Sequence, residues 1–385
     1  MTLAGESLNF ANSEEQELLA ASIARFVERE YAFATRRGII ASADGYSADV
    51  WTTLANLGLL GLPLPSEYGG LGGGAVDAVP VMEGIGEALM VEPYLATVGL
   101  GAQFVARGGT SAQKERILPA VIAGTMKLAF AQIETGARYN LAHIAVRARN
   151  TEDGDFVIDG EKRGVEHGIC ADLLVVSARV TGEIDSREGI GVFLVDPRTP
   201  GVMRRAYRTL DSLRSADIAF ANVRVPADAV LGGENSGLAL IEEVADYATA
   251  LVCAEAVGAI RYANEATLEY LRTRKQFGVP IGAFQALQHR MVDLAIEYEQ
   301  AKSMASLACM SVDTEVDPAQ RSRVVSAAKI RIADACRLVS QESVQLHGAM
   351  GMSDEIKLSH TFRRLTMIAQ QFGDADHHLE RFAKS

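Results

Sequence analysis

The chain has 385 residues, 48% of them hydrophobic, and a formal net charge of −12 with a pI near 5.2. Its length allows two or three packed domains, and an acidic chain without basic runs is not expected to bind nucleic acid. The polar start of the chain lacks an apolar leader, and no apolar stretch approaches the roughly 20 residues of a membrane span. These features predict a cytoplasmic protein that does not enter a membrane.

The first part of the chain, up to about residue 127, has a helical pattern. Ser13–Gln16 and Thr110–Gln113 are predicted capping boxes, each placed ahead of a helix. We expect the second of these helices to end at Pro119 and Gly124, because proline and glycine interrupt helices.

Between about residues 128 and 232 the apolar period changes to two, which is typical of strands. Short apolar or alternating segments predict a small barrel or sandwich with strands at 142–148, 156–158, 173–176, 191–195 and 218–225. The segment 152–155 contains an Asp-Gly pair and is predicted to form a hairpin loop.

From Gly237 onward the helical period returns in long, alanine-rich segments, which predict a four-helix bundle. The predicted class is therefore α+β, with a helical domain at 1–127, a β domain at 128–232 and a helical bundle domain at 233–385.

No metal site or disulfide is expected. The cysteines are too widely spaced for a zinc cluster and are interpreted as buried free thiols; they are Cys170, Cys253, Cys309 and Cys336. The acidic and histidine residues at 374–378 point in different directions on a helix, so they are interpreted as a solvated helix start.

The most informative segment is 270–285, which contains Arg274-Lys-Gln276-Phe277-Gly and, later, Gln285. It resembles the Arg-x-x-Phe-Gly…Gln segment with which acyl-CoA dehydrogenases hold the ADP half of FAD. A second segment, Gln345-Leu-His-Gly348-Ala-Met-Gly, resembles the other part of that site. The helical, β, helical order of the chain also matches this family, so the resemblance covers nearly the whole sequence.

The resemblance implies that these two segments contact FAD bound mainly in a neighbouring subunit. An arginine guanidinium matches pyrophosphate in a bidentate way, which a lysine cannot do. The implied FAD contacts are Arg274, Gln276, Phe277, Gln285, Gln345 and Gly348. Without the resemblance, the same residues are equally well interpreted as the ends of two helices with no role in binding.

The family removes an α-proton from an acyl-CoA with a carboxylate and transfers a hydride to the flavin. One family position for this base lies 27 residues after Gln345 and holds Phe372; the other lies 26 residues before Arg274 and holds Ala248. Neither side chain accepts a proton, so no catalytic residue is identified. Glu255 and Asp374 remain as candidates for a relocated base. Asp246 falls where the family contacts the CoA pantetheine and is expected to bind substrate.

Other residues on the flavin side also depart from the family pattern. Gly164 replaces a tryptophan and Glu166 replaces a threonine that contact the isoalloxazine ring in the family. An anion beside the ring would oppose the negative charge of reduced flavin. The loop at 133–140 has lost most of the family's flavin and thioester donors.

The resemblance extends to heteromeric acyl-CoA dehydrogenases that act on dicarboxylic or ring-derived CoA esters. It implies a base-lacking subunit that completes the FAD site of a homologous subunit in a dimer or an α2β2 heterotetramer, with an acyl-CoA thioester as substrate. Two alternatives stay open. One is a homomeric acyl-CoA dehydrogenase with a relocated base, and the other is a non-catalytic protein that binds acyl-CoA or flavin.

Overall fold

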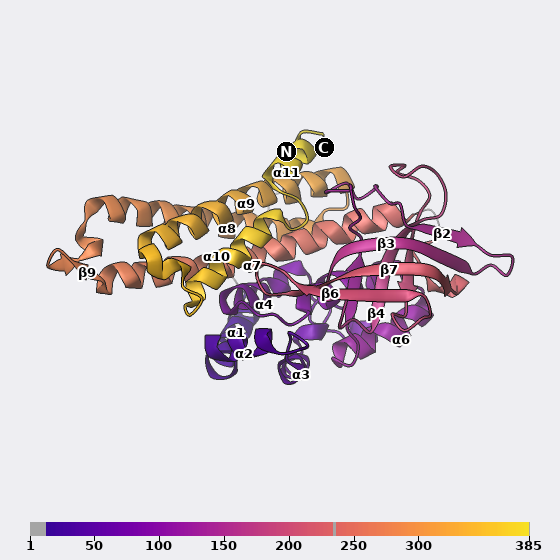
Figure 1. The fold of residues 1–385 in the computed structure, drawn as a ribbon, viewed down its shortest axis with the longest axis horizontal. Coiled ribbons are helices and arrows are strands. Elements are labelled where there is room, and N and C mark those ends of the chain that lie inside the picture. The colour runs from indigo at the N-terminus through magenta and orange to yellow at the C-terminus, as the bar shows by residue number, and fades with distance from the viewer. Residues whose placement is uncertain (1–12, 234–235, 385) are drawn as a thin grey trace.

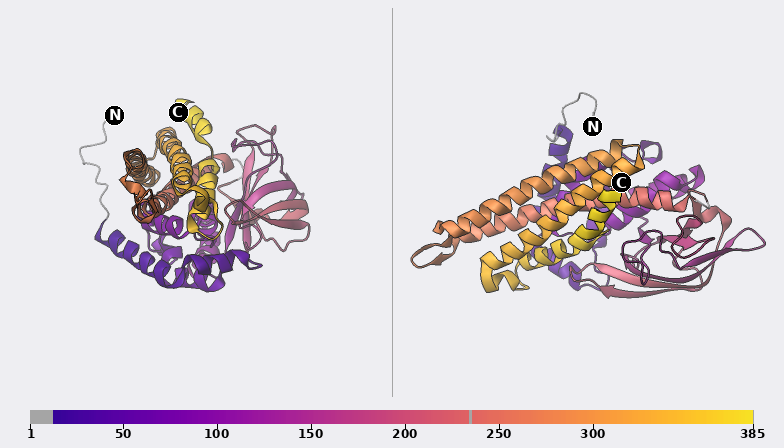
Figure 2. Two further views of the ribbon diagram at one scale, coloured as in Figure 1. Left: turned by 60° about the vertical axis from the view of Figure 1, so that its left-hand side comes forward. Right: turned by 90° about the horizontal axis from the view of Figure 1, so that it is seen from above.

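The computed structural model describes residues 13–233 and 236–384. Figure 1 shows three parts in chain order: helices in indigo to purple, a β-sheet in magenta to pink, and long helices in salmon to yellow. The long helices extend away from the sheet in both Figure 1 and the right-hand view of Figure 2. This arrangement confirms the α+β class predicted from the sequence.

The helices ahead of the sheet, within the described residues, are α1 Glu14–Glu30, α2 Phe33–Ala41, α3 Ala48–Asn56, α4 Ala75–Ala88, α5 Ala102–Gly108 and α6 Ser111–Ile122. Both predicted capping boxes are present. The hydroxyls of Ser13 and Thr110 accept hydrogen bonds from the backbone N–H groups of Gln16 and Gln113, whose side chains accept from the capping backbone in return.

The predicted end of α6 at Pro119 is wrong. The helix continues through Pro119 to Ile122, because a proline removes one N–H donor while its carbonyl still accepts from the next turn. Gly124 follows the helix with a φ of +73°. This left-handed conformation is easily adopted by glycine, so the chain turns there.

The sheet contains β1 Leu128–Ala131, β2 Arg147–Asn150, β3 Phe156–Glu166, β4 Leu173–Arg179, β5 Ile190–Val195, β6 Val202–Arg208, β7 Arg214–Val225 and β8 Val230–Leu231. Its strand order is β6-β7-β3-β2-β4-β5-β8, and β1 pairs with β4 in parallel. The antiparallel β2–β3 hairpin turns at Gly154, whose φ is +86°, as the sequence predicted.

The strand predicted at 142–148 is largely wrong, because β2 begins only at Arg147. The carboxylate of Glu134 accepts hydrogen bonds from the N–H groups of Ala145 and Val146 at 2.6 and 3.2 Å. These donors are satisfied by a side chain, so they need no neighbouring strand. The sequence also missed β6, an edge strand whose mostly exposed residues lack an apolar period.

The predicted bundle is confirmed and consists of α7 Gly237–Thr273, α8 Gln285–Thr314, α9 Pro318–His347 and α10 Lys357–Gln370, followed by the shorter α11 Ala375–Lys384. The N-terminal helix α4 packs on α7 through glycines on both helices. A Cβ on Gly86 or on Gly258 would lie 1.9 Å from a backbone oxygen of the other helix, so only glycine permits this crossing. Among the described residues, the helices are all too short or too polar to cross a membrane.

Candidate functional site

The end of the bundle remote from the sheet carries the segment predicted to bind the ADP half of FAD (Figures 1 and 2). After α7, a two-stranded hairpin of β9 Lys275–Gln276 and β10 Val279–Pro280 leads through the short turn η5 Ile281–Ala283 into α8. Phe277 and Gly278 form the hairpin turn with φ values of +55° and +81°. The hairpin therefore presents this segment at the tip of the molecule.

The polar side chains of the hairpin segment are exposed. Those of Arg274, Gln276 and Gln285 make no hydrogen bond or ion pair within residues 13–233 and 236–384. Phe277 is 90% exposed and contacts the ring of Phe284 edge-on at 6.1 Å between centroids. An exposed aromatic residue in a left-handed conformation contributes little to the stability of its own chain, because the backbone conformation costs energy and the ring is not buried. The segment is therefore suited to contact another molecule.

The second predicted segment lies beside the first. The helix α9 ends at His347, and the turn Gly348–Met352 follows, with Gln345 and Gly348 exposed. The His347 ring stacks on the ring of Tyr270, near the end of α7, with centroids 4.4 Å apart. This stack brings the two segments together at one end of the bundle. Their contacts with FAD stay a prediction.

Phe372, which the resemblance places at one family position of the base, lies in a firmly held turn between α10 and α11. Its φ is +60° and that of Gly373 is +126°. The buried Lys329 ammonium donates to carbonyls at the end of α10 and to the Gly373 carbonyl, at 2.8 to 3.3 Å. The His378 Nε2–H donates to the Phe372 carbonyl at 3.2 Å. The turn is well fixed but carries no proton acceptor, and Ala248 at the other position is fully buried.

The two candidates for a relocated base are already bound to other groups. Arg364 Nε and Nη2 donate to both oxygens of Glu255 at 2.6 and 2.8 Å, and both residues are buried. Asp374 caps α11, since its carboxylate accepts from the His377 N–H at 2.9 Å. The interpretation of 374–378 as a solvated helix start is wrong for His378, which is buried.

Asp246 lines a cavity of about 990 Å³ between the start of α7, the α8–α9 connection and α11. It is buried and pairs with Arg321 at 3.2 Å and with Arg381 at 2.6 Å. Burial raises the pKa of the Asp246 carboxyl, and the two guanidinium groups oppose this rise. Other basic residues of the cavity each pair with a glutamate; they are Arg107, Arg187 and Lys384. The cavity wall therefore carries five lysine and arginine residues together with six acidic residues, so a phosphate-bearing ligand would have to take cations from their carboxylate partners.

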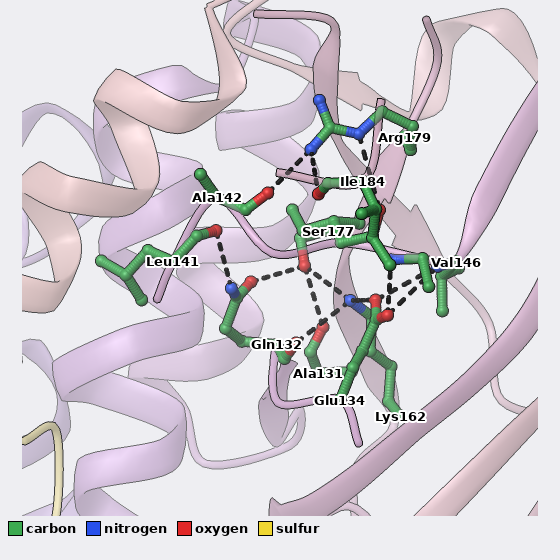
Figure 3. Close-up of polar contacts among 12 residues, drawn as sticks. Ala131, Gln132, Glu134, Leu141, Ala142, Val146, Lys162, Ser177, Arg179 and Ile184 are labelled. Carbon is green, nitrogen blue, oxygen red and sulfur yellow. Dashed lines mark hydrogen bonds and ion pairs between the residues drawn. The ribbon is translucent and has the colours of Figure 1, made fainter. Parts of the chain in front are cut away.

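The loop 133–140 is anchored by a buried ion pair shown in Figure 3. Lys162 Nζ lies 2.6 Å from Glu134 Oε1 and also donates to the Ser177 hydroxyl at 2.8 Å. The Ser177 hydroxyl in turn donates to the side-chain oxygen of Gln132. Burial lowers the pKa of Lys162 to about 8, and Glu134 opposes this shift. Because these groups satisfy one another, the network serves to position the loop.

On the flavin side, Arg364 and Gln371 connect the bundle to the middle domain. Arg364 Nη1 donates to Asp211 in the β6–β7 turn at 2.7 Å. Gln371 Nε2 donates to Glu166 Oε2 at 2.9 Å. Burial raises the pKa of Glu166 to about 7, and Arg364 opposes this rise. The expected anion at this position is therefore partly protonated near neutral pH.

Sequence reasoning missed Arg364 for a physical reason. Its partners Glu255 and Asp211 lie 109 and 153 residues away along the chain, so no local pattern marks the contact. The same holds for Gln371, whose partner Glu166 is 205 residues away.

The raised pKa of Glu166 predicts a pH dependence of stability. The folded state keeps a proton that the unfolded chain releases, so stability falls as the pH rises from the ordinary value of 4.5 to about 7. Glu166→Gln preserves an acceptor for Gln371 but cannot ionise. We expect it to reduce the loss of unfolding free energy between about pH 5 and 8 by about 1–3 kcal/mol.

Urea unfolding at both pH values measures this effect. Glu161→Gln is the matched control, because Glu161 is exposed on the same strand. An identical pH dependence in wild type and Glu166→Gln would show that Glu166 releases its proton as readily in the folded state as in the unfolded chain.

The two sides of the site fit FAD differently. At the bundle end, Arg274 and Gln345 are exposed and have no side-chain partner within the described residues, which suits recognition of a pyrophosphate. On the flavin side, Gln371 and Glu166 bond directly to each other, and Glu166 is the residue that the resemblance places beside the ring. The residues predicted on the ADP side therefore suit the cofactor better than those predicted on the flavin side.

Known proteins resemble this chain along most of its length. Models of the acyl-CoA dehydrogenase N-terminal, middle and C-terminal domains match residues 13–125, 129–223 and 235–385. The chain is 27% identical to the probable acyl-CoA dehydrogenase YngJ of Bacillus subtilis, covering 97% of this chain and 98% of that protein. It is 30% identical to mitochondrial isovaleryl-CoA dehydrogenase of Pongo abelii, covering 73% of this chain and 68% of that protein.

Solved structures show the same fold. Butyryl-CoA dehydrogenase from Megasphaera elsdenii matches with a TM-score of 0.86 and 25% identity, over 98% of this chain and 99% of that one. A variant of the Tcur3481–Tcur3483 steroid ACAD also matches with a TM-score of 0.86, at 27% identity over 96% and 97% of the two chains. The chain therefore belongs to the acyl-CoA dehydrogenase family of FAD-dependent oxidoreductases.

Proposed function

We propose that this chain is the base-lacking subunit of a heteromeric acyl-CoA dehydrogenase and completes the FAD site of a homologous partner. The observation that carries this proposal is an asymmetry between the two sides of the site. The ADP-side residues at the bundle end are exposed and unpaired within the described residues. The flavin-side residues are paired with one another, and both family positions of the base hold apolar side chains.

The proposed division of labour follows from what each group can do. Bound FAD supplies the hydride acceptor in this family. In the proposed complex, Arg274 pairs with the pyrophosphate, Gln276, Gln285 and Gln345 donate neutral hydrogen bonds, Phe277 covers the cofactor, and Gly348 lets the backbone approach it. The partner subunit supplies the carboxylate that takes the α-proton.

The proposed substrate is an acyl-CoA thioester. The cavity beside Asp246 has the volume and the basic residues to take the phosphate-bearing part of such a molecule. Because Asp246 is already paired with Arg321 and Arg381, we propose that it acts on the substrate by orienting these two guanidinium groups. This differs from the direct pantetheine contact expected from the sequence.

A heteromeric assembly has a parallel among the similar proteins, since one of them is named by two components, as the Tcur3481–Tcur3483 steroid ACAD. A homomeric enzyme with a relocated base is less well supported, because Glu255 is held by Arg364 and Asp374 caps a helix. A non-catalytic protein that binds acyl-CoA or flavin is also less well supported. It would have no partner subunit whose FAD the exposed Arg274 could contact.

The proposal is tested by Arg274→Ala in the complex with the homologous partner. We expect FAD affinity to fall by about 10–100-fold, because a charge-assisted hydrogen bond worth about 1.5–3 kcal/mol is lost. Isothermal titration of FAD into wild-type and variant apo-complexes measures the change. Arg272→Ala is the matched control, because Arg272 is also exposed but belongs to the last turn of α7. Equal FAD affinities in wild type and Arg274→Ala would show that Arg274 only terminates the helix and does not bind the cofactor.

A further inference from the structure

The ammonium group of Lys357 lies at the contact between α10 and α7. Lys357 is the first residue of α10, and its Nζ is 3.8 Å from the centroid of the Tyr262 ring on α7. The side chain is half-buried, and within residues 13–233 and 236–384 its ammonium makes no hydrogen bond or ion pair. The partner that the structure gives to this cation is therefore the face of an aromatic ring.

The carboxylates closest to Lys357 in space and in sequence are held by other groups. Glu87 of α4 pairs with Arg261 at 2.6 Å. Asp354, three residues earlier in the chain, pairs with Arg363 at 2.8 Å. Neither carboxylate holds the Lys357 ammonium in an ion pair, so little besides the ring favours the charged form of this side chain.

Burial lowers the pKa of Lys357 to about 8. Glu87 and the exposed Glu265 of α7 oppose this shift, and Arg36 of α2 adds to it. The start of a helix also disfavours a cation, and Lys357 begins α10. A large share of the amine is therefore unprotonated near pH 8, and the unprotonated amine is the nucleophile.

The buried lysines Lys162 and Lys329 differ from Lys357, because hydrogen-bond acceptors hold their protons. Lys162 pairs with Glu134, and Lys329 donates to three backbone carbonyls. Both side chains are fully enclosed, so a reagent does not reach them. Lys357 combines partial burial, which favours the free amine, with partial exposure, which leaves the amine within reach of a reagent.

We propose that Lys357 is a modification site, acylated on Nζ by acyl thioesters with short acyl groups. The Nζ lone pair attacks the thioester carbonyl carbon, a C–N bond forms, and the C–S bond breaks. The thiol leaves with the proton that the amine loses, so the products are an amide and a free thiol and no further reactant is needed. The amide is neutral, so the attraction between the cation and the Tyr262 ring is lost.

This inference goes beyond the proposed function and does not depend on it. Lys357 is not among the residues that line the cavity beside Asp246, and it has no assigned part in binding FAD. A short acyl group suits the site because the amine is only partly exposed beside Tyr262. The reaction needs only a thioester in solution, with or without a partner subunit.

The test incubates the full-length chain with acetyl-CoA and follows acetylation of single lysines by peptide mass spectrometry. Lys302 is the comparison residue, because it is exposed on α8 and makes no hydrogen bond or ion pair within the described part of the chain. An ordinary lysine is about 99% protonated at pH 8, so we expect acetylation of Lys357 to be at least about ten-fold faster there. The rate at Lys357 should level off above about pH 8, whereas the rate at Lys302 should keep rising.

Intact-mass measurements on two variants provide a second test. Lys357→Arg keeps a positive charge beside the Tyr262 ring but offers no free amine, so the fast phase of acetyl incorporation should disappear. Lys302→Arg is the matched control and should retain that phase. Equal rates at Lys357 and Lys302 in the wild type would overturn the proposal. So would a rate at Lys357 that keeps rising with pH, or a fast phase that persists in Lys357→Arg.

Discussion

Purified alone, the chain will oxidise acyl-CoA at least about 10²–10⁴-fold more slowly than the heteromer, because that is the usual contribution of a general base. Phe372 and Ala248 occupy the two family positions of this base, and Glu255 is bound to Arg364. The isolated chain should also retain FAD substoichiometrically. Acyl-CoA-dependent reduction of an artificial electron acceptor and the flavin absorbance spectrum measure both properties. A stoichiometric yellow protein with dehydrogenase activity would favour the homomeric enzyme with a relocated base.

The variant Phe372→Glu tests whether the predicted lack of a base is the only obstacle to catalysis in this chain. It restores a carboxylate in a largely enclosed turn, where burial should raise its pKa. Catalysis also requires the flavin ring close to the substrate, and a misplacement of about 1 Å can cost about 100-fold in rate. Because Gln371 and Glu166 still fill this region, we expect no rescue in the isolated chain. Stopped-flow bleaching of flavin by substrate in this variant would show that only the base was missing.

Arg364→Met will lower the free energy of unfolding by about 3–5 kcal/mol. The change leaves Glu255 and Asp211 as buried carboxylates without their main partner, and breaking a buried ion pair from one side carries a penalty of about this size. The three residues come from α10, α7 and the β6–β7 turn, so their loss should loosen the contact between the bundle and the middle domain. Urea unfolding followed by circular dichroism measures the destabilisation.

Arg363→Met is the matched control for Arg364→Met. Arg363 is adjacent in sequence and pairs with Asp354, a carboxylate that is 62% exposed. Surface ion pairs contribute only about 0–1 kcal/mol, so this variant should stay close to wild type. Equal destabilisation by the two substitutions would mean that the buried network contributes no more to stability than the surface pair.

The sequence by itself determined the features that depend on local or regularly spaced signals. The change of apolar period from helical to strand and back predicted the order of the three parts, and both capping boxes formed as predicted. The segments at 270–285 and 345–351 pointed to FAD because their residue types stand at fixed spacings. The prediction that no base stands at Phe372 and Ala248 likewise came from counting residues, and it stays a prediction.

Only the tertiary structure decided how the flavin side is arranged. Glu255 is an acidic residue like any other in the sequence, and its partner Arg364 is found only when α7 and α10 pack together. The strand predicted at 142–148 is largely absent because the carboxylate of Glu134, 11 and 12 residues earlier in the chain, accepts from the backbone N–H groups there. Burial, which raises the pKa of Glu166 and sets the pairing of Asp246, is a property of the packed chain. A side-chain contact such as that between Glu255 and Arg364, which are 109 positions apart, leaves no periodic trace, so sequence patterns could not reveal it.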